Sequence, residues 1–235
     1  MNIPERDIYT DIHTHLLPGI DDGSRSTEES LELLAMEYER GIRTVLFTPH
    51  YRRTGSSIYA KVAYEHFLCD VKENRPEIFR DTAFGLGQEL TWHESLIDRL
   101  QSGDALTLSG TNLSLIEFDP GIPYDRMAQE LRRLLNAGFL PVIAHMERYE
   151  ALTSIEPVTE LRRMGCRMQV NYKSITGDGM TGREAPFGGI FSKEVKRVRG
   201  LIKDGMIDYY GTDTHRMDYR PPKIEKALEW LRKNG

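Results

Sequence analysis

The chain has 235 residues, of which 31 are basic and 36 acidic, so its formal net charge is −5. A chain of this length can bury a sizeable core without crosslinks, and we expect a single domain over residues 1–235. The weak negative charge argues against nucleic acid as a partner, because a phosphate backbone requires a basic face. Its two cysteines, Cys69 and Cys166, cannot form a disulfide framework and fit a reducing compartment.

The N-terminal sequence MNIPERDIYTDIH has no basic segment followed by an apolar one, so no signal peptide is predicted. No apolar run approaches the ~18 residues that a membrane-spanning helix requires. We therefore expect a cytoplasmic protein that does not insert into a membrane.

Short apolar runs alternate with amphipathic stretches along the chain. The first run, 8–15, precedes a capping box at 26–29 that begins a helix ending at Gly41. Seven such runs, separated by helical patterns, favour a closed barrel of parallel strands over an open, doubly wound sheet. The other strand-like runs are 44–48, 82–89, 113–118, 142–144, 168–171 and 207–213, and the other helical patterns are 57–75, 123–138, 157–165, 191–205 and 222–233.

One segment, 172–189, departs from this alternation. It contains five glycines and has little periodicity. Because it follows the sixth strand, it would lie over the end of the barrel that carries the catalytic groups. A surface loop and a substrate lid are both compatible with its composition.

Residue types that bind metals stand where the apolar runs end. Side chains at i and i+2 of a strand share one side, so His13 and His15 can bind one ion together. Imidazole combined with carboxylate suits zinc, manganese or iron, and carboxylates can bridge two ions of a hydrolase. The further candidates are the adjacent Asp21 and Asp22, which follow the first run, and, at the ends of the later runs, His50, Glu89, Glu117, His145, Asp213 and His215.

A lone buried histidine is more often a satisfied core residue than a metal ligand. Here, however, five of the seven histidines lie at the ends of four separate strands. Barrel interiors favour branched apolar residues, so packing does not account for this set. The other two, His66 and His93, lie away from the strand ends, and we assign them no role.

Arg148 comes shortly after the fifth strand. A guanidinium at the opening of a metal site can bind a phosphate through two hydrogen bonds. It can also stabilise the negative charge that develops in the transition state. A salt bridge with Glu147 or Glu150 is the alternative. For Arg52 and Arg53, a solvated charge pair is the simpler interpretation.

Cys69 and Arg75 have the Cys-x5-Arg spacing of phosphatases that use a cysteine nucleophile. The residues between them, 70–74, include two carboxylates and no glycine, and they belong to a helical pattern. We therefore interpret Cys69 as a partly buried helix residue. The glycine-rich loops that bind nucleotides are absent from the sequence.

Taken together, these motifs resemble the polymerase-and-histidinol-phosphatase (PHP) superfamily. The opening DIHTHLLPGIDDGS is similar to its bacterial branch of manganese-dependent tyrosine-protein phosphatases of capsule and exopolysaccharide biosynthesis. The motifs span residues 11 to about 231 in the superfamily's order: Asp-x-His-x-His at 11–15, Thr-Pro-His at 48–50, Gly-Gln-Glu at 87–89, Ile-Glu-Phe at 116–118, His-x-Glu-Arg at 145–148 and Asp-x-His at 213–215.

The resemblance implies a distorted, TIM-like (β/α)7 barrel of the PHP type, with three divalent metal ions at the C-terminal ends of its parallel strands. Manganese is the expected metal, with iron and zinc as alternatives. Arg148 would be catalytic, and Asp11 and Glu147 would orient the ligands. The implied ligand sets are His13, His15, Glu89 and Asp213 for the first ion, Glu89, Glu117 and His145 for the second, and Asp22, His50 and His215 for the third.

The implied activity is hydrolysis of phosphotyrosine on a protein by in-line attack of a metal-bound hydroxide. The expected partner is a phosphotyrosine-containing protein, the tyrosine-rich tail of a bacterial autokinase that controls polysaccharide export. Two alternatives remain open. One is a phosphoesterase acting on a small monoester such as histidinol phosphate, and the other is a non-catalytic, metal-stabilised regulator.

Three features depart from the superfamily's usual pattern. Met146 replaces proline, Thr-Asp-Thr-His at 212–215 replaces Ser-Asp-Ala-His, and the loop after the sixth strand is longer. None of these changes alters a predicted ligand. The longer loop bears on the choice of substrate.

Overall fold

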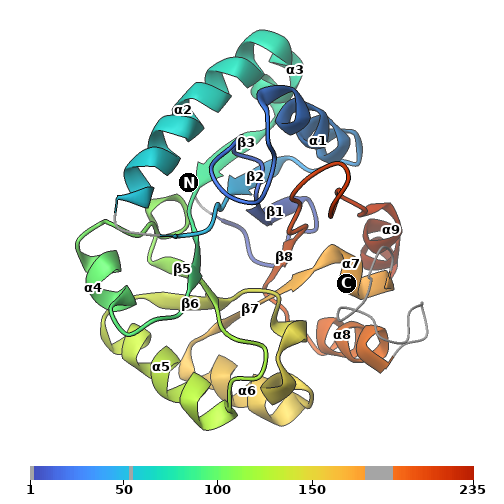
Figure 1. Cartoon of the computed structure of the whole chain (residues 1–235). Coiled ribbons are helices and arrows are strands. Elements are labelled where there is room, and N and C mark those ends of the chain that lie inside the picture. The colour runs from blue at the N-terminus through green and yellow to red at the C-terminus, as the bar shows by residue number, and fades with distance from the viewer. Residues whose placement is uncertain (1–2, 53–54, 178–192) are drawn as a thin grey trace.

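The computed structural model describes residues 3–52, 55–177 and 193–235, which form a ring of parallel strands surrounded by helices (Figure 1). The predicted parallel α/β fold is confirmed, because every strand pair is parallel. The strands are β1 (Thr10–Thr14), β2 (Thr44–Phe47), β3 (Ala83–Leu86), β4 (Glu89–Thr91), β5 (Leu113–Glu117), β6 (Leu140–Ile143), β7 (Arg167–Asn171) and β8 (Tyr209–Gly211).

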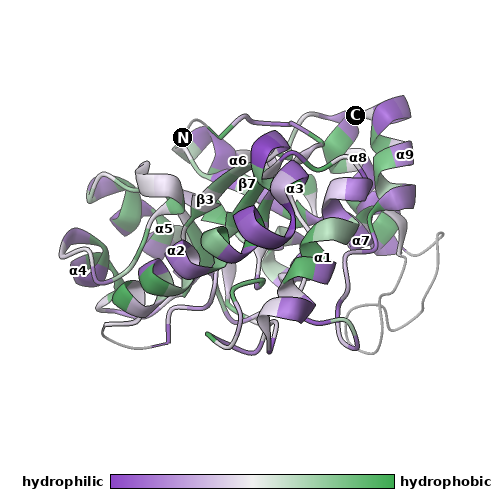
Figure 2. Cartoon of the chain, turned by 90° about the horizontal axis from the view of Figure 1, so that it is seen from above, coloured by the Kyte–Doolittle hydropathy of each residue, from purple (hydrophilic) through white to green (hydrophobic). Residues whose placement is uncertain are grey.

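Helices cover the outside of this ring, and each outer helix carries both hydrophilic and hydrophobic residues (Figure 2). Their apolar faces pack on the strands, as the buried Leu34, Phe67 and Leu131 illustrate. The helices are α1 (Thr27–Glu39), α2 (Ser56–Asn74), α3 (Pro76–Asp81), α4 (Leu96–Gln101), α5 (Tyr124–Asn136), α6 (Ile155–Met164), α7 (Tyr172–Thr176), α8 (Lys193–Lys203) and α9 (Glu225–Asn234), with short 3₁₀ turns η1 (Leu108–Gly110), η2 (Met146–Arg148) and η3 (Glu150–Leu152).

The strands form two sheets, ordered β1-β2-β3 and β4-β5-β6-β7-β8. Two isolated parallel bridges join them: Thr14 pairs with Thr214 beyond β8, and His50 pairs with Glu89 at the start of β4. The first junction lies at the C-terminal end of β1, and the second joins the segment just beyond the C-terminal end of β2 to the start of β4. The ring is therefore a distorted barrel, tied together at the end where the predicted ligands lie.

The single third strand predicted at 82–89 is in fact two strands. Its first half, β3, pairs with β2, and its second half, β4, pairs with β5. Between them a Cβ at Gly87 would lie 2.7 Å from Leu108 Cδ2 and 3.1 Å from Leu108 Cα. A side chain at position 87 would crowd Leu108 of η1, and the chain changes partner at this point.

The start of α1 has the predicted cap by Ser26, while the Glu29 side chain accepts from the residue before Ser26. Ser26 Oγ accepts from Glu29 N at 3.3 Å, while Glu29 Oε2 accepts from Arg25 N at 2.9 Å. The helix ends before Gly41, which has φ +101°. A local sequence signal was sufficient here because both halves of the motif lie within five residues.

The segment 172–189 is in part helical, contrary to the prediction. Its first five residues form α7, in which Tyr172 and Ile175 are fully buried. The Tyr172 hydroxyl donates to Ile8 O at 3.1 Å and to Thr10 O at 3.2 Å, so this end of the segment is held against β1. The rest of the predicted loop or lid, from 178 onward, lies outside the described residues.

No helix in the described part of the chain is long and apolar enough to cross a membrane.

Candidate metal centre

The first group of predicted ligands lies on β1 and just after β8. His13 and His15 are fully buried, and their Nε2 atoms are 3.2 Å apart. Asp213 Oδ1 lies 3.9 Å from His13 Nε2 and 3.7 Å from His15 Nε2. The alternation along β1 therefore brings both imidazoles to one carboxylate, and donor atoms of these three residues lie close enough together to hold one ion.

The carboxylate of Glu89 lies at the middle of the cluster and contacts four imidazoles. Its Oε1 is 3.3 Å from His13 Nε2 and 2.9 Å from His145 Nε2. Its Oε2 is 3.3 Å from His15 Nε2 and 3.1 Å from His50 Nδ1. This two-sided contact is the geometry that a carboxylate bridging two ions requires.

A second group surrounds the other side of Glu89. His145 Nε2 lies 3.4 Å from Glu117 Oε1, which is one-quarter exposed. Donor atoms of His50, Glu89 and Glu117 also lie within 4.8 Å of one another. Glu117 therefore connects the buried part of the cluster to its open side.

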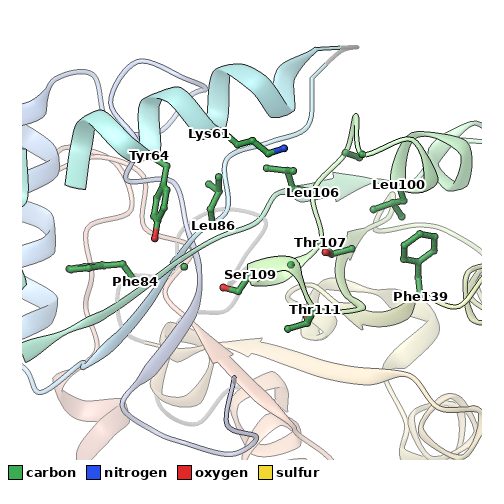
Figure 3. A pocket seen from close by; sticks show the side chains of 14 residues that line it. Lys61, Tyr64, Phe84, Leu86, Leu100, Leu106, Thr107, Ser109, Thr111 and Phe139 are labelled. Atoms are coloured by element: carbon green, nitrogen blue, oxygen red, sulfur yellow. The ribbon is translucent and has the colours of Figure 1, made fainter. Parts of the chain in front are cut away.

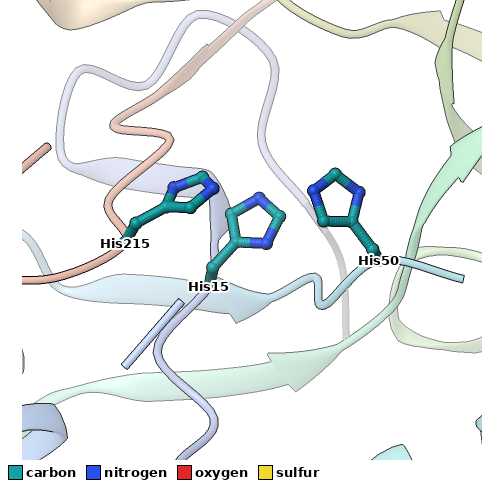
Figure 4. A group of neighbouring side chains, drawn as sticks. All are labelled: His15, His50 and His215. Atoms are coloured by element: carbon teal, nitrogen blue, oxygen red, sulfur yellow. The ribbon is translucent and has the colours of Figure 1, made fainter. Parts of the chain in front are cut away.

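A third group consists of His15, His50 and His215, with the His15 ring between the other two (Figure 4). The ring centroid of His15 is 4.6 Å from that of His50 and 4.1 Å from that of His215. Asp22, the predicted carboxylate of this group, lies farther out. Its Oδ1 is 3.5 Å from His50 Nε2 and its Oδ2 is 3.9 Å from His215 Nε2.

Asp22 differs from the other predicted ligands in its exposure. Its side chain is 56% exposed, and its Oδ1 accepts a hydrogen bond of 2.6 Å from Arg52 Nη2. The predicted solvated pairing of Arg52 is therefore present, but its partner is a candidate ligand. Arg53 lies outside the described residues.

In this cluster, ionised carboxylates face imidazole rings. Burial alone would raise the pKa of Glu89, but His13 and the neighbouring imidazoles lower it well below its usual range. The pKa of Asp213 is likewise lowered despite burial, chiefly by Arg148 and His13. Burial and the charge of His15 lower the pKa of His215 to about 4. These carboxylates are ionised at neutral pH, and His215 is neutral. Despite burial, Asp21 and Glu89 raise the pKa of His15, and Glu117 and Glu89 raise that of His145, so metal binding would displace protons from these two imidazoles.

Asp21 and Gln169, to which the sequence analysis gave no role, contact the predicted ligands His15, His50 and His145. Asp21 Oδ2 lies 2.7 Å from His15 Nδ1 and accepts from His50 N at 2.9 Å. Gln169 Oε1 accepts from His145 N at 2.6 Å. A carboxylate on the far nitrogen of a ligating imidazole fixes its tautomer and raises its basicity. The His-x-His motif is followed by two adjacent aspartates, which indicates an acidic residue near the histidines. The pattern does not indicate which of the two aspartates faces His15.

The two residues expected to orient ligands have different contacts. Asp11 Oδ1 accepts from His13 N at 3.0 Å and from Thr212 N at 3.1 Å, so it holds β1 to the segment after β8. Glu147 Oε1 instead accepts from Asn171 N at 3.1 Å and from Ser174 Oγ at 2.6 Å, at the junction of β7 and α7.

Two of the predicted ligands have left-handed backbone conformations. His145 has φ +33° and Asp213 has φ +54°. Such conformations are costly for residues other than glycine and are found at sites where the surroundings enforce them. Asp213 N donates to His13 O at 2.8 Å, which fixes the backbone of one ligand to that of another.

Two guanidinium groups lie at the edge of the cluster. Arg148 Nη2 donates to Asp213 Oδ2, so the predicted catalytic arginine does adjoin the ligands. Arg220 Nη1 lies 3.2 Å from the same oxygen. The sequence analysis missed Arg220 because only the turn at 216–219 returns it to Asp213.

His66 and Cys69 lie on α2, and both are exposed, so the prediction that Cys69 is partly buried is wrong.

A separate hollow of about 570 Å³ lies between α2, β3 and η1 (Figure 3). Lys61, Tyr64, Leu86 and Ser109 are among the residues that line it. Its lining contains none of the predicted ligands and no carboxylate. It is therefore not part of the candidate metal centre.

The donor set fits divalent metal ions. Imidazole nitrogens and carboxylate oxygens lie about 3 to 4 Å from one another. They come from the ends of β1, β2, β5, β6 and β8 and from the start of β4. Nitrogen and oxygen donors of this mixture are typical ligands of manganese, iron and zinc. The three groups His15–His50–His215, His13–His15–Asp213 and His50–Glu89–Glu117 are each close enough to hold an ion.

Comparison with known proteins gives one consistent family. The model of the family described as "Capsular polysaccharide synthesis, CpsB/CapC" matches residues 9–235. The tyrosine-protein phosphatase CpsB of Streptococcus pneumoniae is 33% identical over 224 residues, which cover 95% of this chain and 89% of that protein. The tyrosine-protein phosphatase YwqE of Bacillus subtilis is 27% identical, over 95% of this chain and 84% of that protein.

A solved structure supports the fold assignment independently. It comes from work on YwqE of Bacillus subtilis and CpsB of Streptococcus pneumoniae, described there as metal-dependent tyrosine phosphatases. It superposes with a TM-score of 0.79 at 24% identity and covers 95% of this chain and 86% of that chain. The barrel is thus shared with that structure.

Replacement of Asp21 by asparagine tests whether the aspartate orients His15 toward a metal. An amide cannot accept from His15, His50 N and Gly23 N as the carboxylate does, so we expect the affinity for Mn²⁺ to fall by ~10–100-fold. Isothermal titration of the purified variant measures this affinity. Asp204→Asn, an exposed residue just after α8, is the matched control. Unchanged Mn²⁺ affinity in Asp21→Asn would contradict the assigned role.

Proposed function

The chain belongs to the capsular polysaccharide synthesis family CpsB/CapC, and from this membership we propose that it is a metal-dependent protein-tyrosine phosphatase. The observation that carries the proposal is the contact of one buried carboxylate, Glu89, with four imidazoles beside two arginines. Groups that bind metal ions lie here beside guanidinium groups. Such a site suits the transfer of a phosphoryl group, because both can stabilise its negative charge.

We propose three divalent ions, with Mn²⁺ as the native metal. When bound, they would supply a water activated for attack on phosphorus and would neutralise the charge of the phosphoryl oxygens. The residues that would hold them are the nine predicted ligands: His13, His15, Asp22, His50, Glu89, Glu117, His145, Asp213 and His215.

The protein's own part in the reaction would fall to Arg148 and Arg220. A guanidinium offers two parallel donors to phosphate oxygens, and both side chains already donate toward Asp213 Oδ2. They would orient the phosphate and stabilise the charge of the transition state. The leaving group is a phenolate, whose conjugate acid, the phenol, has a pKa of ~10. It can therefore leave without strong protonation by a general acid.

The proposed substrate is phosphotyrosine on a protein, namely the tyrosine-rich tail of a bacterial autokinase of capsule or exopolysaccharide synthesis, in the cytoplasm. The support for it is the relatives' names, which join tyrosine phosphatase activity to capsule synthesis. A comparison of kcat/KM on phosphotyrosyl peptides with that on histidinol phosphate tests this choice. Higher kcat/KM on histidinol phosphate would favour a phosphoesterase of small molecules.

Hydrolysis of p-nitrophenyl phosphate tests the chemistry itself. We expect activity that depends on added Mn²⁺, stops with a chelator and is unchanged in Cys69→Ser, because the attacking group is activated by metal rather than supplied by a thiol. Steady-state absorbance measures it. Activity that survives chelation but is lost in Cys69→Ser would refute the proposal. Bound metal without hydrolysis of any phosphate ester would instead indicate a regulator.

Replacement of either arginine by alanine tests its role in the transition state. We expect kcat to fall by at least ~10²-fold in Arg148→Ala, as it does when a donor to developing charge is removed, and to fall also in Arg220→Ala. Metal content, measured by plasma mass spectrometry, should be unchanged in both variants. Full turnover in Arg148→Ala would show that its assigned role is wrong.

A further inference from the structure

Five of the six large apolar side chains that are exposed in the described part of the chain lie in two segments. Ile58, Tyr59 and Val62 lie in the first two turns of α2, and Met217 and Tyr219 lie in the turn after β8. All of these segments follow the C-terminal ends of strands, where the candidate metal centre lies. We call these five residues the apolar rim.

The half of the apolar rim after β8 touches the centre directly. The ring of Tyr219 is 45% exposed and meets the ring of His215 edge-on, with centroids 6.0 Å apart. The guanidinium carbon of Arg220 lies 5.0 Å from the centroid of the Tyr219 ring. Met217 N donates to Glu29 Oε1 at 3.0 Å, which attaches the turn to the start of α1. This part of the rim is thus a wall of the mouth.

The other half of the apolar rim is joined to His50 by a short connection. Ser56, the first residue of α2, comes six positions after His50, so the Cα atoms of the two lie at most about 21 Å apart. Asp104 binds both sides of this connection, because it accepts from the Tyr51 hydroxyl at 2.7 Å and from Gly55 N. Ser57 Oγ donates to Gly103 O at 3.2 Å. The exposed face of α2 is therefore held in place beside the mouth.

An exposed Ile, Tyr and Val within five residues of one helix is costly in water unless a partner covers it. The Ile58 and Tyr59 side chains are 64% and 63% exposed. The core of a docking surface is typically apolar and aromatic in this way, with charged groups around it. The two halves of the apolar rim lie on either side of the segment after β1, because β1 pairs with β2 and its end pairs with Thr214 beyond β8.

We infer that the apolar rim docks the polypeptide that carries the phosphotyrosine, through apolar side chains before and after that residue. The inference rests on the proposed function, since it takes the metal centre as the site that receives the phosphate. An extended chain advances ~3.3 Å per residue, so about six residues reach from the centre to α2. A free phosphate ester has no such flanking residues and does not use the rim.

The test compares two phosphotyrosyl peptides, one with Leu and Val within six residues on both sides and one with Gly and Ser there. We expect wild-type kcat/KM to be higher on the apolar peptide by ~10-fold or more, mainly through KM, as for loss of uniform binding. The triple variant Ile58→Ser, Tyr59→Ser, Val62→Ser should lose this preference. Its hydrolysis of p-nitrophenyl phosphate should match that of the wild type.

Ile155→Ser is the matched control. Ile155 is the remaining large apolar side chain that is exposed in the described part of the chain, and it begins α6, across the barrel from α2 (Figure 1). The control should keep the preference. A wild-type enzyme that treats the two peptides alike, or a triple variant that keeps the preference, overturns the inference while the proposed function stands.

The inference can also be tested if no peptide is hydrolysed, the result that would refute the proposed function. Fluorescence anisotropy then measures the Kd of the same two sequences with phosphonomethyl-phenylalanine in place of phosphotyrosine. Tighter binding of the apolar sequence, lost in the triple variant, supports the docking surface. Sedimentation that detects a dimer of the wild type but not of the triple variant overturns it, because a second copy then covers the rim.

Discussion

One buried carboxylate determines much of this molecule. Glu89 is 1% exposed, and its two oxygens lie 2.9 to 3.3 Å from four imidazoles, which come from the ends of three strands, β1, β2 and β6. Taking such a charge out of water is costly unless opposite charge or coordination compensates for it. Divalent ions would meet this need and hold the converging strand ends together. The left-handed backbones of His145 and Asp213 fit the same account, because the surroundings must enforce them.

The distortion of the barrel is what brings Glu89 to this position. The chain changes sheets at Gly87, where a side chain would crowd Leu108 of η1, and β4 begins at Glu89 itself. The bridge between His50 and Glu89 then joins the two sheets. A regular third strand, as predicted from 82–89, would pair along one neighbour throughout. The irregularity and the candidate centre are thus one feature of the fold.

Much of the centre could be predicted from the sequence because its residues stand at strand ends. Alternation placed His13 with His15, and the order of the motifs indicated the family. What could not be predicted depends on contacts between distant segments. Asp21 and Asp22 are neighbours, yet one is buried against His15 and the other is 56% exposed beside Arg52. Arg220 reaches Asp213 only through the turn after β8, and the periodicity of 172–176 is too short to indicate the buried α7.

The central claim is that Glu89 is shared by metal ions rather than by protonated histidines. Anomalous diffraction at the manganese edge, from crystals grown with Mn²⁺, tests it most directly. The account predicts separate anomalous peaks on either side of the Glu89 carboxylate, each within about 2.0–2.3 Å of a carboxylate oxygen or imidazole nitrogen, the range of such metal–ligand bonds. A Glu89 carboxylate that contacts only imidazoles, with no peak beside it in crystals that contain Mn²⁺, would contradict the account.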